Sequence, residues 1–396
     1  MSELRHVLVG QSGGPTAAIN ASLAGVVTGA REAGARVTGM RYGIQGFLAG
    51  RTVNLDEALP DQQSLELLRE TPASWLGSCR FKLPNPADDE AFFANAFARL
   101  EEEHIDAVIY IGGNDSMDTI AKLGAYGKAV GSPIRLVGVP KTIDNDLMGT
   151  DHTPGYGSAA RFVATAVKEI ARDADAYDLK SVTYVEIMGR DAGWLAASSA
   201  LASPDIVLLP EVPLELDVLI DHIAELLARK NTVVVGVSEG VRTPDGQLLC
   251  ERVSEDEAGV DEFGHLATLS GTSRRLAQMT KQTLGCKTRA VEISTLQRCA
   301  SYMASSADLN EAFELGRTSV QAAAAGQSVC MCALERLSDD PYTTRTVTVD
   351  VASVANKVRT LPCEWITEDH MGVTEDFLRY VRPLVGELPE QLPALE

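Results

Sequence analysis

Short apolar runs alternate with longer amphipathic segments along most of this 396-residue chain. A helix that follows a strand returns the chain to the same edge of a sheet, so alternating strands and helices build parallel sheets. The pattern predicts an α/β fold of two Rossmann-like domains with mainly parallel sheets. We expect strands at 7–9, 37–40, 107–111, 136–139, 181–187, 206–209 and 232–237, and helices at 17–33, 62–70, 89–103, 117–130, 159–174, 191–202 and 215–229.

Polar loops that contain glycine or lysine follow three of the expected strands. Gly13 and Gly14 come after the first strand, a second glycine pair comes after 107–111, and the loop at 140–146 comes after a third strand. Backbone N–H groups at the start of a helix favour an anion, and glycine lets a phosphate approach them closely. One glycine pair is often only a tight turn. Three such loops at the carboxyl ends of parallel strands predict one large phosphate pocket.

Motifs and charge exclude several classes of protein. Neither the Walker pattern nor the G-x-G-x-x-G fingerprint occurs at a strand-to-helix turn, which argues against an ordinary nucleotide kinase fold or a dinucleotide dehydrogenase. The net charge of −20 argues against a nucleic-acid-binding surface, because such a surface must be basic.

The termini and the cysteines favour a cytoplasmic protein. No apolar run reaches about 18 residues, and the first residues lack the apolar core of a signal peptide. The seven cysteines do not follow a metal-ligand spacing, and an odd number suits a reducing compartment. Cys330 and Cys332 could be a metal or redox pair, but buried apolar side chains are the favoured interpretation.

Eight motifs together resemble those of the bacterial-type 6-phosphofructokinase family, within its pyrophosphate-dependent branch. They stand in the family's order and at about its spacing: Ser12-Gly13-Gly14, Tyr42-Gly43, Gly77-Ser78-Cys79-Arg80-Phe81, Gly112 to Ser116, Pro140 to Asp146, Met188-Gly189-Arg190, Glu239-Gly240, and Thr288-Arg289 through Gln297-Arg298. The resemblance implies reversible phosphoryl transfer from pyrophosphate to the 1-hydroxyl of fructose 6-phosphate. The products would be fructose 1,6-bisphosphate and phosphate, in glycolysis and gluconeogenesis.

The resemblance also implies how the chain is divided. Residues 1–150 and about 298–345 would form the larger domain, which binds the phosphoryl donor. Residues 151–297 and about 346–396 would form the smaller domain, which binds the sugar phosphate, with the active site in the cleft between the domains. Residues beyond about 345 extend past the short bacterial enzymes, and the last of them resemble a tail.

Asp144 is the expected general base. A carboxylate at a strand end can accept the proton of the attacking hydroxyl, which is worth about 10²–10⁴-fold in rate. On spacing alone, the alternative is that Asp144 caps a turn, as Asn145 and Asp146 would. Phosphoryl transfer also needs cations around the transferred group, and Lys141 and Arg190 are the expected ones.

Two positions favour pyrophosphate over ATP as the donor. ATP-dependent relatives resemble Gly-Gly-Asp-Gly-Ser and Pro-Gly-Thr-Ile-Asp-Asn, with glycine where this chain has Asp115 and Lys141. A carboxylate at Asp115 would repel the α-phosphate of a nucleotide, whereas Lys141 can pair with the terminal phosphate of pyrophosphate. Alternatively, the two side chains pair with each other and leave the donor open. Gly13, Gly14 and Arg80 complete the expected donor-binding set.

Mg²⁺ is the expected cofactor, with Asn114 and Asp115 as its ligands. Asn114 stands where many relatives carry an aspartate, and its neutral oxygen is a poorer ligand for Mg²⁺ than a carboxylate. Asp115 or Asp146 could hold the ion instead, directly or through water. Mg²⁺ also arrives bound to the phosphates, so few protein ligands are needed.

The expected sugar-phosphate site combines one carboxylate with two arginines. Glu239 would accept a hydrogen bond from the sugar, and Arg289 and Arg298 would hold the 6-phosphate, because a guanidinium suits bidentate binding. In tetrameric relatives the counterpart of Arg289 comes from a neighbouring subunit, so we expect a homodimer or homotetramer. The remaining expected substrate-binding residues are Thr142, Asp144, Met188, Gly189, Arg190 and Thr295.

Some positions leave alternatives open. Thr295 stands where relatives carry a histidine, and Ser181 stands where they carry an arginine, so sedoheptulose 7-phosphate is a possible second substrate. The alternatives to the main prediction are an ATP-dependent 6-phosphofructokinase and a catalytically silent subunit that binds sugar phosphates.

Overall fold

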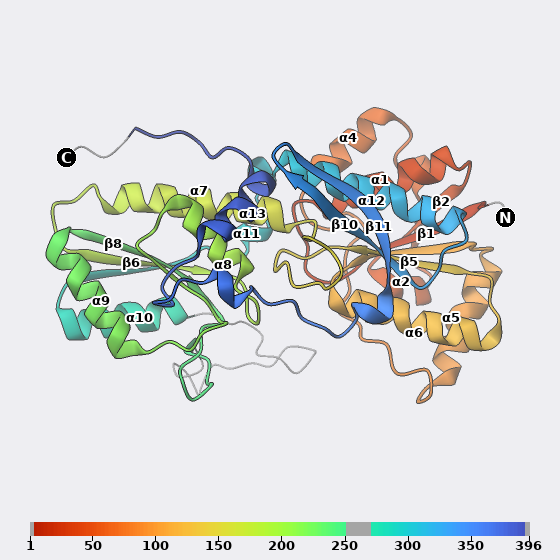
Figure 1. The fold of residues 1–396 in the computed structure, drawn as a ribbon. Coiled ribbons are helices and arrows are strands. Elements are labelled where there is room, and N and C mark those ends of the chain that lie inside the picture. Colours follow the sequence, from red (N-terminus) through yellow and green to blue (C-terminus); the bar gives the residue numbers. More distant parts are fainter. Residues whose placement is uncertain (1–3, 251–270, 393–396) are drawn as a thin grey trace. The chain divides into compact units, whose positions relative to one another are not determined.

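The structure, a computed structural model, describes residues 4–250 and 271–392. The chain divides into two compact units (Figure 1). Unit 1 contains Met1–Ile143, Leu147–Ser158 and Arg298–Lys357, and unit 2 contains Asp144–Asp146, Ala159–Gln297 and Val358–Glu396. Each unit has its own sheet with helices packed against it, so the predicted α/β fold with two mainly parallel sheets is confirmed.

Unit 1 is built on a seven-stranded sheet in the order β11-β10-β5-β4-β1-β2-β3. The strands from β10 to β2 are parallel, and the two edge strands β11 and β3 are antiparallel to their neighbours. A parallel sheet must be covered on both faces, and all residues of β1 and β4 are buried. The strands are β1 (His6–Gln11), β2 (Arg36–Met40), β3 (Thr52–Asn54), β4 (Ala107–Gly112), β5 (Arg135–Pro140), β10 (Cys330–Asp339) and β11 (Tyr342–Asp350).

Alternate side chains of β1 supply two cores in unit 1. Val7 and Val9 pack with α1 and α12 on one face of the sheet, whereas Leu8 packs with α5 and α6 on the other (Figure 1). The α1–α12 contact is close, because a Cβ on Gly25 would lie 1.9 Å from the Phe313 carbonyl oxygen. The helices of unit 1 are α1 (Ile19–Glu32), α2 (Gly43–Leu48), α3 (Leu55–Ala58), α4 (Gln62–Glu70), α5 (Glu90–Glu102), α6 (Asn114–Val130) and α12 (Ser306–Ala324).

A buried ionic network joins α12 to the β10–β11 hairpin. His152 is 1% exposed, and its two ring nitrogens lie 2.8 Å from Asp151 Oδ2 and 2.7 Å from Glu311 Oε2. Arg336 of β10 donates to Asp151 at 2.9 Å, and the Tyr342 hydroxyl of β11 donates to Glu311 at 2.7 Å. The imidazole therefore lies between two carboxylates that are each bonded to the hairpin.

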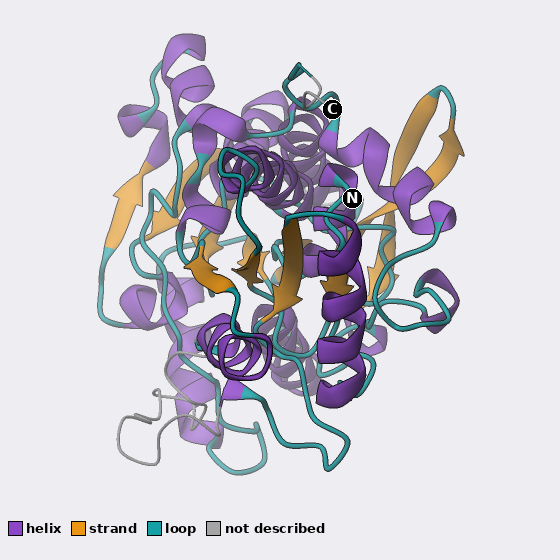
Figure 2. Cartoon of the chain, turned by 90° about the vertical axis from the view of Figure 1, so that its left-hand side faces the viewer, coloured by secondary structure: helices purple, strands orange, loops and turns teal. Residues whose placement is uncertain are grey.

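Unit 2 has a four-stranded parallel sheet in the order β7-β8-β6-β9. Helices α9 and α10 pack on one side of it and α7 runs along the other, and Figure 2 shows strands between layers of helices. The strands are β6 (Ser181–Ile187), β7 (Ile206–Leu208), β8 (Thr232–Ser238) and β9 (Lys287–Glu292). The helices are α7 (Tyr156–Ala174), which begins in unit 1, α8 (Trp194–Ser198), α9 (Leu216–Arg229), α10 (Thr272–Leu284), α11 (Leu296–Cys299) and α13 (Glu375–Val385).

Several expected boundaries need correction. Helix α6 begins at Asn114 rather than near 117, so the expected metal ligands lie in its first turn. The expected helix at 191–202 is the short α8 followed by a 3-10 turn. Residues 346–357 belong to unit 1, because β11 pairs with β10 and Val351 and Val354 enter the core of that unit.

Two further features bear on the sequence-based expectations. Cys330 and Cys332 are buried in β10 among core residues, as predicted. Within 4–250 and 271–392, none of the helices combines the length and the apolar character that a membrane span requires.

Candidate active site

The three loops expected to bind phosphate begin at one edge of the sheet of unit 1. Strands β5, β4 and β1 are neighbours, and each loop follows the carboxyl end of its strand. The Ser12 amide donates to the Ile111 carbonyl at 2.9 Å, and the Lys141 amide donates to the Gly112 carbonyl at 2.9 Å. These bonds continue the strand pairing past the sheet edge and hold the loops side by side.

Lys141 is buried beside the first glycine loop. Lys141 is only 2% exposed, and its Nζ donates to the Gly14 carbonyl oxygen at 2.6 Å. A Cβ on Gly13, which has a φ of +76°, would lie 3.3 Å from the same Nζ. The positive φ favours glycine at position 13, and a larger residue there would also crowd the lysine. The arrangement fixes a positive charge against the loop expected to bind phosphate.

Further donor-side residues surround the glycine loop. The Ser78 hydroxyl donates to the Gly13 carbonyl at 2.6 Å, and Arg80 follows two residues later with an exposed side chain. A Cβ on Gly14 would lie 3.5 Å from Nη1 of Arg298. The expected donor residues Gly13, Gly14 and Lys141 are therefore together, and Arg298, expected at the sugar 6-phosphate, lies next to them.

Asn114 and Asp115 lie in the first turn of α6, directly after the N-cap residue Gly113. Asp115 is exposed and Asn114 is half-buried. Among the residues that the structure describes, no group of three or more histidine, cysteine, aspartate or glutamate side chains could hold a metal ion. An ion bound here would take most of its ligands from phosphate and water, which suits Mg²⁺.

In unit 2 the loops after β6 and β8 contact each other. The Gly189 amide donates to Glu239 Oε1 at 3.3 Å, and the Ser238 hydroxyl donates to the Gly189 carbonyl at 2.6 Å. A Cβ on Gly240 would lie 1.9 Å from the Arg190 carbonyl oxygen, so only glycine fits at that position. Arg190 and Glu239 thus come from adjacent loops whose backbones are in contact.

Glu239 has an unusual acidity. Burial is the main cause that raises the pKa of its carboxyl to about 8, and the negative charges of Asp144 and Glu186 raise it further. The Gly189 amide and the positive charge of Arg190 act in the opposite direction. These interactions bring Asp144, Gly189, Arg190 and Glu239 together in unit 2.

The other predicted substrate residues are more dispersed. Met188 follows β6 directly, and its amide donates to Gln297 Oε1 at 3.0 Å. Thr142 belongs to unit 1, where its amide donates to the Pro154 carbonyl at 3.2 Å. Thr295 is exposed.

Arg289 lies away from the Glu239 group within unit 2. It pairs in register with Thr183 near the beginning of β6, about 13 Å along the strand from the end at which Met188 and Arg190 follow. Its guanidinium forms an ion pair with Asp173. Arg289 and Glu239 of one chain are therefore not brought together.

The sequence interpretation missed the residues that hold the loop of Asp144. Asn145 donates to the Tyr380 hydroxyl, and its carbonyl accepts from Arg359. Both partners lie in the part of the chain expected to end in a tail. The sequence contained a signal for this packing, because Trp365, Phe377 and Tyr380 lie close together in the segment. Aromatic side chains at this density indicate a segment that packs against the rest of the chain.

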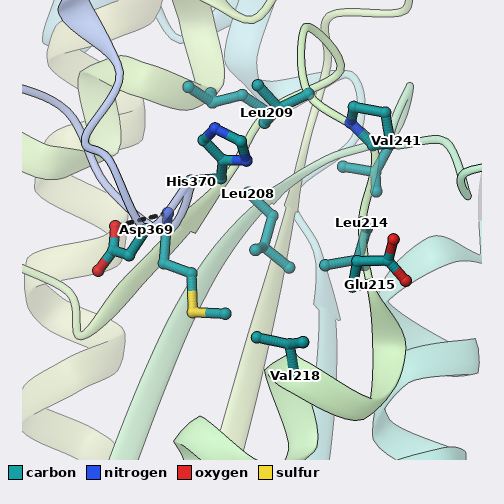
Figure 3. Close-up of a pocket in the computed structure, with 11 residues that line it drawn as sticks. Leu208, Leu209, Leu214, Glu215, Val218, Val241, Asp369 and His370 are labelled. Atoms are coloured by element: carbon teal, nitrogen blue, oxygen red, sulfur yellow. Dashed lines mark hydrogen bonds between the residues drawn. The ribbon is translucent and has the colours of Figure 1, made fainter.

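An apolar cavity of about 100 Å³ lies elsewhere in unit 2, beside β7 and the start of α9 (Figure 3). Its wall is formed mainly by leucine and valine side chains, with Glu215 and His370 at its edge. Asp369 accepts a hydrogen bond from the Met371 amide at 3.0 Å. None of the predicted site residues lines this cavity, so it is separate from the candidate active site.

Glycine loops at the carboxyl ends of parallel strands, with a buried lysine beside them, are typical of proteins that bind phosphorylated ligands. A family model described as Phosphofructokinase matches residues 6–323, and the chain belongs to the phosphofructokinase family. This match confirms the family that the motifs of the sequence predicted.

Individual relatives match over nearly the whole chain. The chain is 38% identical over 393 residues to pyrophosphate--fructose 6-phosphate 1-phosphotransferase of Xanthomonas campestris pv. campestris (strain B100), covering 97% of this chain and 92% of the relative. It is 36% identical to the protein of the same name from Halomonas elongata, covering 95% and 90%. The crystal structure of a pyrophosphate-dependent phosphofructokinase from Nitrosospira multiformis superimposes with a TM-score of 0.86 at 31% identity, covering 99% of this chain and 94% of that one.

Proposed function

We propose that this protein reversibly transfers a phosphoryl group from pyrophosphate to the 1-hydroxyl of fructose 6-phosphate. The products are fructose 1,6-bisphosphate and phosphate, as in glycolysis and gluconeogenesis, and the protein works in the cytoplasm. The main support is Lys141, whose buried Nζ lies 2.6 Å from the Gly14 carbonyl oxygen. The motif of ATP-dependent relatives has glycine at the position of this lysine. The relatives described above carry the name of this activity.

The two units have different roles in this proposal. Unit 1 binds the donor through Gly13, Gly14, Arg80, Asp115 and Lys141. Unit 2 supplies most of the sugar contacts, whereas Thr142 and Arg298 belong to unit 1. Glu239 accepts a hydrogen bond from one of the sugar hydroxyls.

Asp144 removes the proton from the 1-hydroxyl as that oxygen forms a bond to the terminal phosphorus of pyrophosphate. The bond between this phosphorus and the bridging oxygen breaks, and inorganic phosphate leaves. Lys141 and Arg190 offset the charge that moves onto the leaving group. In the reverse direction, protonated Asp144 returns the proton to the 1-oxygen.

Mg²⁺ fits the exposed carboxylate of Asp115 and the amide of Asn114, which would hold it together with phosphate oxygens. When bound, the ion supplies charge neutralisation on the pyrophosphate.

The 6-phosphate is held by arginines. Arg298 provides one guanidinium, and Arg289 serves a neighbouring copy of the chain, because it lies at the opposite end of β6 from Met188. Thr142, Met188, Gly189 and Thr295 complete the substrate contacts. A homodimer or homotetramer follows from this use of Arg289.

The test is the formation of fructose 1,6-bisphosphate with either pyrophosphate or ATP as the sole donor. We expect turnover with pyrophosphate, a large loss in Lys141→Gly, and little change in Lys128→Ala, which alters an exposed lysine in the last turn of α6. Turnover with ATP alone would refute the donor assignment. Binding of fructose 6-phosphate without turnover would indicate a silent subunit, and activity in Asp144→Asn would refute the role of the base.

A further inference from the structure

The segment that follows residue 357 contacts the loop of the expected base. Arg359 donates through Nε and Nη2 to the Asn145 carbonyl oxygen, at 3.2 and 3.0 Å. The backbone amide of Arg359 donates to the Asp146 carbonyl oxygen at 2.8 Å. One residue of the C-terminal segment therefore bonds to the carbonyl oxygens of both residues that follow Asp144.

Asn145 is held a second time through its side chain. Its Nδ2 donates to the Tyr380 hydroxyl at 2.9 Å, and the residue is fully buried. Its φ of +55° lies in the left-handed region, which costs energy for most residues but is tolerated by asparagine. The bonds from Arg359 and Tyr380 together select this backbone conformation directly after Asp144.

The two anchoring side chains are themselves rigidly supported. The Arg359 guanidinium lies 4.4 Å from the centroid of the Trp194 ring, and Trp194 Nε1 donates to the Arg359 carbonyl at 2.9 Å. The Tyr380 ring packs 5.5 Å from Trp194 and 5.1 Å from Trp365. Such cation–π and aromatic contacts limit the motion of both side chains.

A half-buried carboxylate fixes the path of the same segment. Glu211 Oε1 accepts from the Leu361 amide at 2.9 Å and from the Gly193 amide at 2.7 Å. Gly193 directly precedes Trp194, so Glu211 joins the residue before the tryptophan to a residue just after Arg359. Glu211 therefore holds the segment just after the residue that contacts the loop.

We propose that Arg359 and Tyr380 are positioning residues that hold Asp144 in its reactive orientation. The proposal rests on the function proposed above, in which Asp144 is the base. A base must lie within hydrogen-bond reach of the proton it accepts, and small displacements reduce the rate strongly. The C-terminal extension therefore contributes to the chemical step, although neither Arg359 nor Tyr380 touches the reacting atoms.

Tyr380→Phe and Arg359→Lys test the proposal with small changes. The first removes only the hydroxyl and keeps the aromatic packing, and the second keeps the charge over Trp194 but not the paired donors. We expect kcat to fall about 3- to 10-fold in Tyr380→Phe and roughly 10- to 100-fold in Arg359→Lys, in line with the loss of neutral and charged hydrogen bonds. KM for pyrophosphate should stay unchanged, because the donor site is not altered.

Phe377→Leu is the matched control. Phe377 belongs to the same aromatic cluster, with its ring 6.3 Å from that of Tyr380. The hydrogen bonds to the loop of Asp144 come from Tyr380 and Arg359. We expect Phe377→Leu to lower the melting temperature more than Tyr380→Phe while kcat stays near that of the wild type. A loss of kcat that follows the melting temperature across these variants would refute the positioning role.

A double-variant cycle separates this inference from the function on which it rests. In an Asp144→Asn background the effect of Tyr380→Phe on the residual rate should disappear, because the group being positioned is gone. A Tyr380→Phe effect of the same size in both backgrounds would refute the positioning role alone. Full activity of Asp144→Asn would refute the role of Asp144 itself.

Discussion

The raised pKa of Glu239 makes a quantitative prediction about pH. With a pKa of about 8, roughly one tenth of the Glu239 carboxyl groups are ionised at pH 7, half at pH 8 and nine tenths at pH 9. The ionised form is the better acceptor for a sugar hydroxyl, because hydrogen bonds to a charged oxygen are stronger. We therefore expect kcat/KM for fructose 6-phosphate to rise about tenfold between pH 7 and pH 9.

The magnitude depends on the surroundings of the carboxyl. Burial contributes most to the raised pKa, followed on the raising side by the charges of Asp144 and Glu186. The second ionisation of a sugar phosphate lies near pH 6, so the phosphate is already a dianion over the measured range. Ionisation of fructose 6-phosphate therefore does not cause the rise.

The assay is the initial rate of fructose 1,6-bisphosphate formation at low fructose 6-phosphate, from pH 7 to pH 9.5. Glu239→Gln should be less active and should lose the rise. Glu225→Gln, which changes an exposed glutamate of α9, should keep it. A flat wild-type profile, or the same rise in Glu239→Gln, would refute the assignment.

Binding measurements test the electrostatic part separately. In Asp144→Asn a negative charge that raises the pKa of Glu239 is removed, so that pKa should fall. The pH at which fructose 6-phosphate affinity rises, measured by calorimetry, should therefore move to lower values. An unchanged midpoint would show that Asp144 does not act on Glu239.

Two other predictions concern stability and space. Burial alone would lower the pKa of His152, but the hydrogen bonds and charges of its two carboxylate neighbours raise this pKa to about 9. The raised pKa contributes about 3 kcal/mol to the free energy of unfolding, fully below pH 6.5, and this contribution is lost as the pH rises through 9. Urea unfolding should show this loss in the wild type and in His104→Asn but not in His152→Gln. Gly240→Ala should abolish fructose 6-phosphate binding, because its Cβ would lie 1.9 Å from the Arg190 carbonyl oxygen, whereas Gly372→Ala, measured by the same titration, should bind normally.

Local patterns predicted most of the elements and the donor loop. The apolar runs at 107–111 and 136–139 became β4 and β5, and the residue that ends β5 is Pro140, as the missing amide of proline requires. Lys141 then follows at the sheet edge by necessity. These features are determined by residues that are close together in the sequence, so the sequence alone was sufficient to predict them.

Contacts between distant parts of the chain could not be predicted in this way. The bond from Asn145 to Tyr380 joins residues 235 positions apart, and no periodicity relates them. The left-handed conformation of Asn145 and the placement of Arg298 beside Gly14 likewise result from packing. The domain boundary near 345 was displaced for the same reason, because the β10–β11 pairing keeps β11 in unit 1.

The anchoring of the loop at both ends explains how a short polar segment can carry the base. Only three peptide bonds separate Lys141 from Asp144, so the Cα atoms of these residues are never more than about 11 Å apart. Lys141 is bonded to the Gly14 carbonyl before Asp144, and Asn145 is bonded to Arg359 and Tyr380 after it. Fixing the backbone of one residue costs about 1–2 kcal/mol, and here protein contacts meet that cost before any substrate binds. Substrate binding energy then remains available for the transition state, so loosening either anchor should appear in kcat.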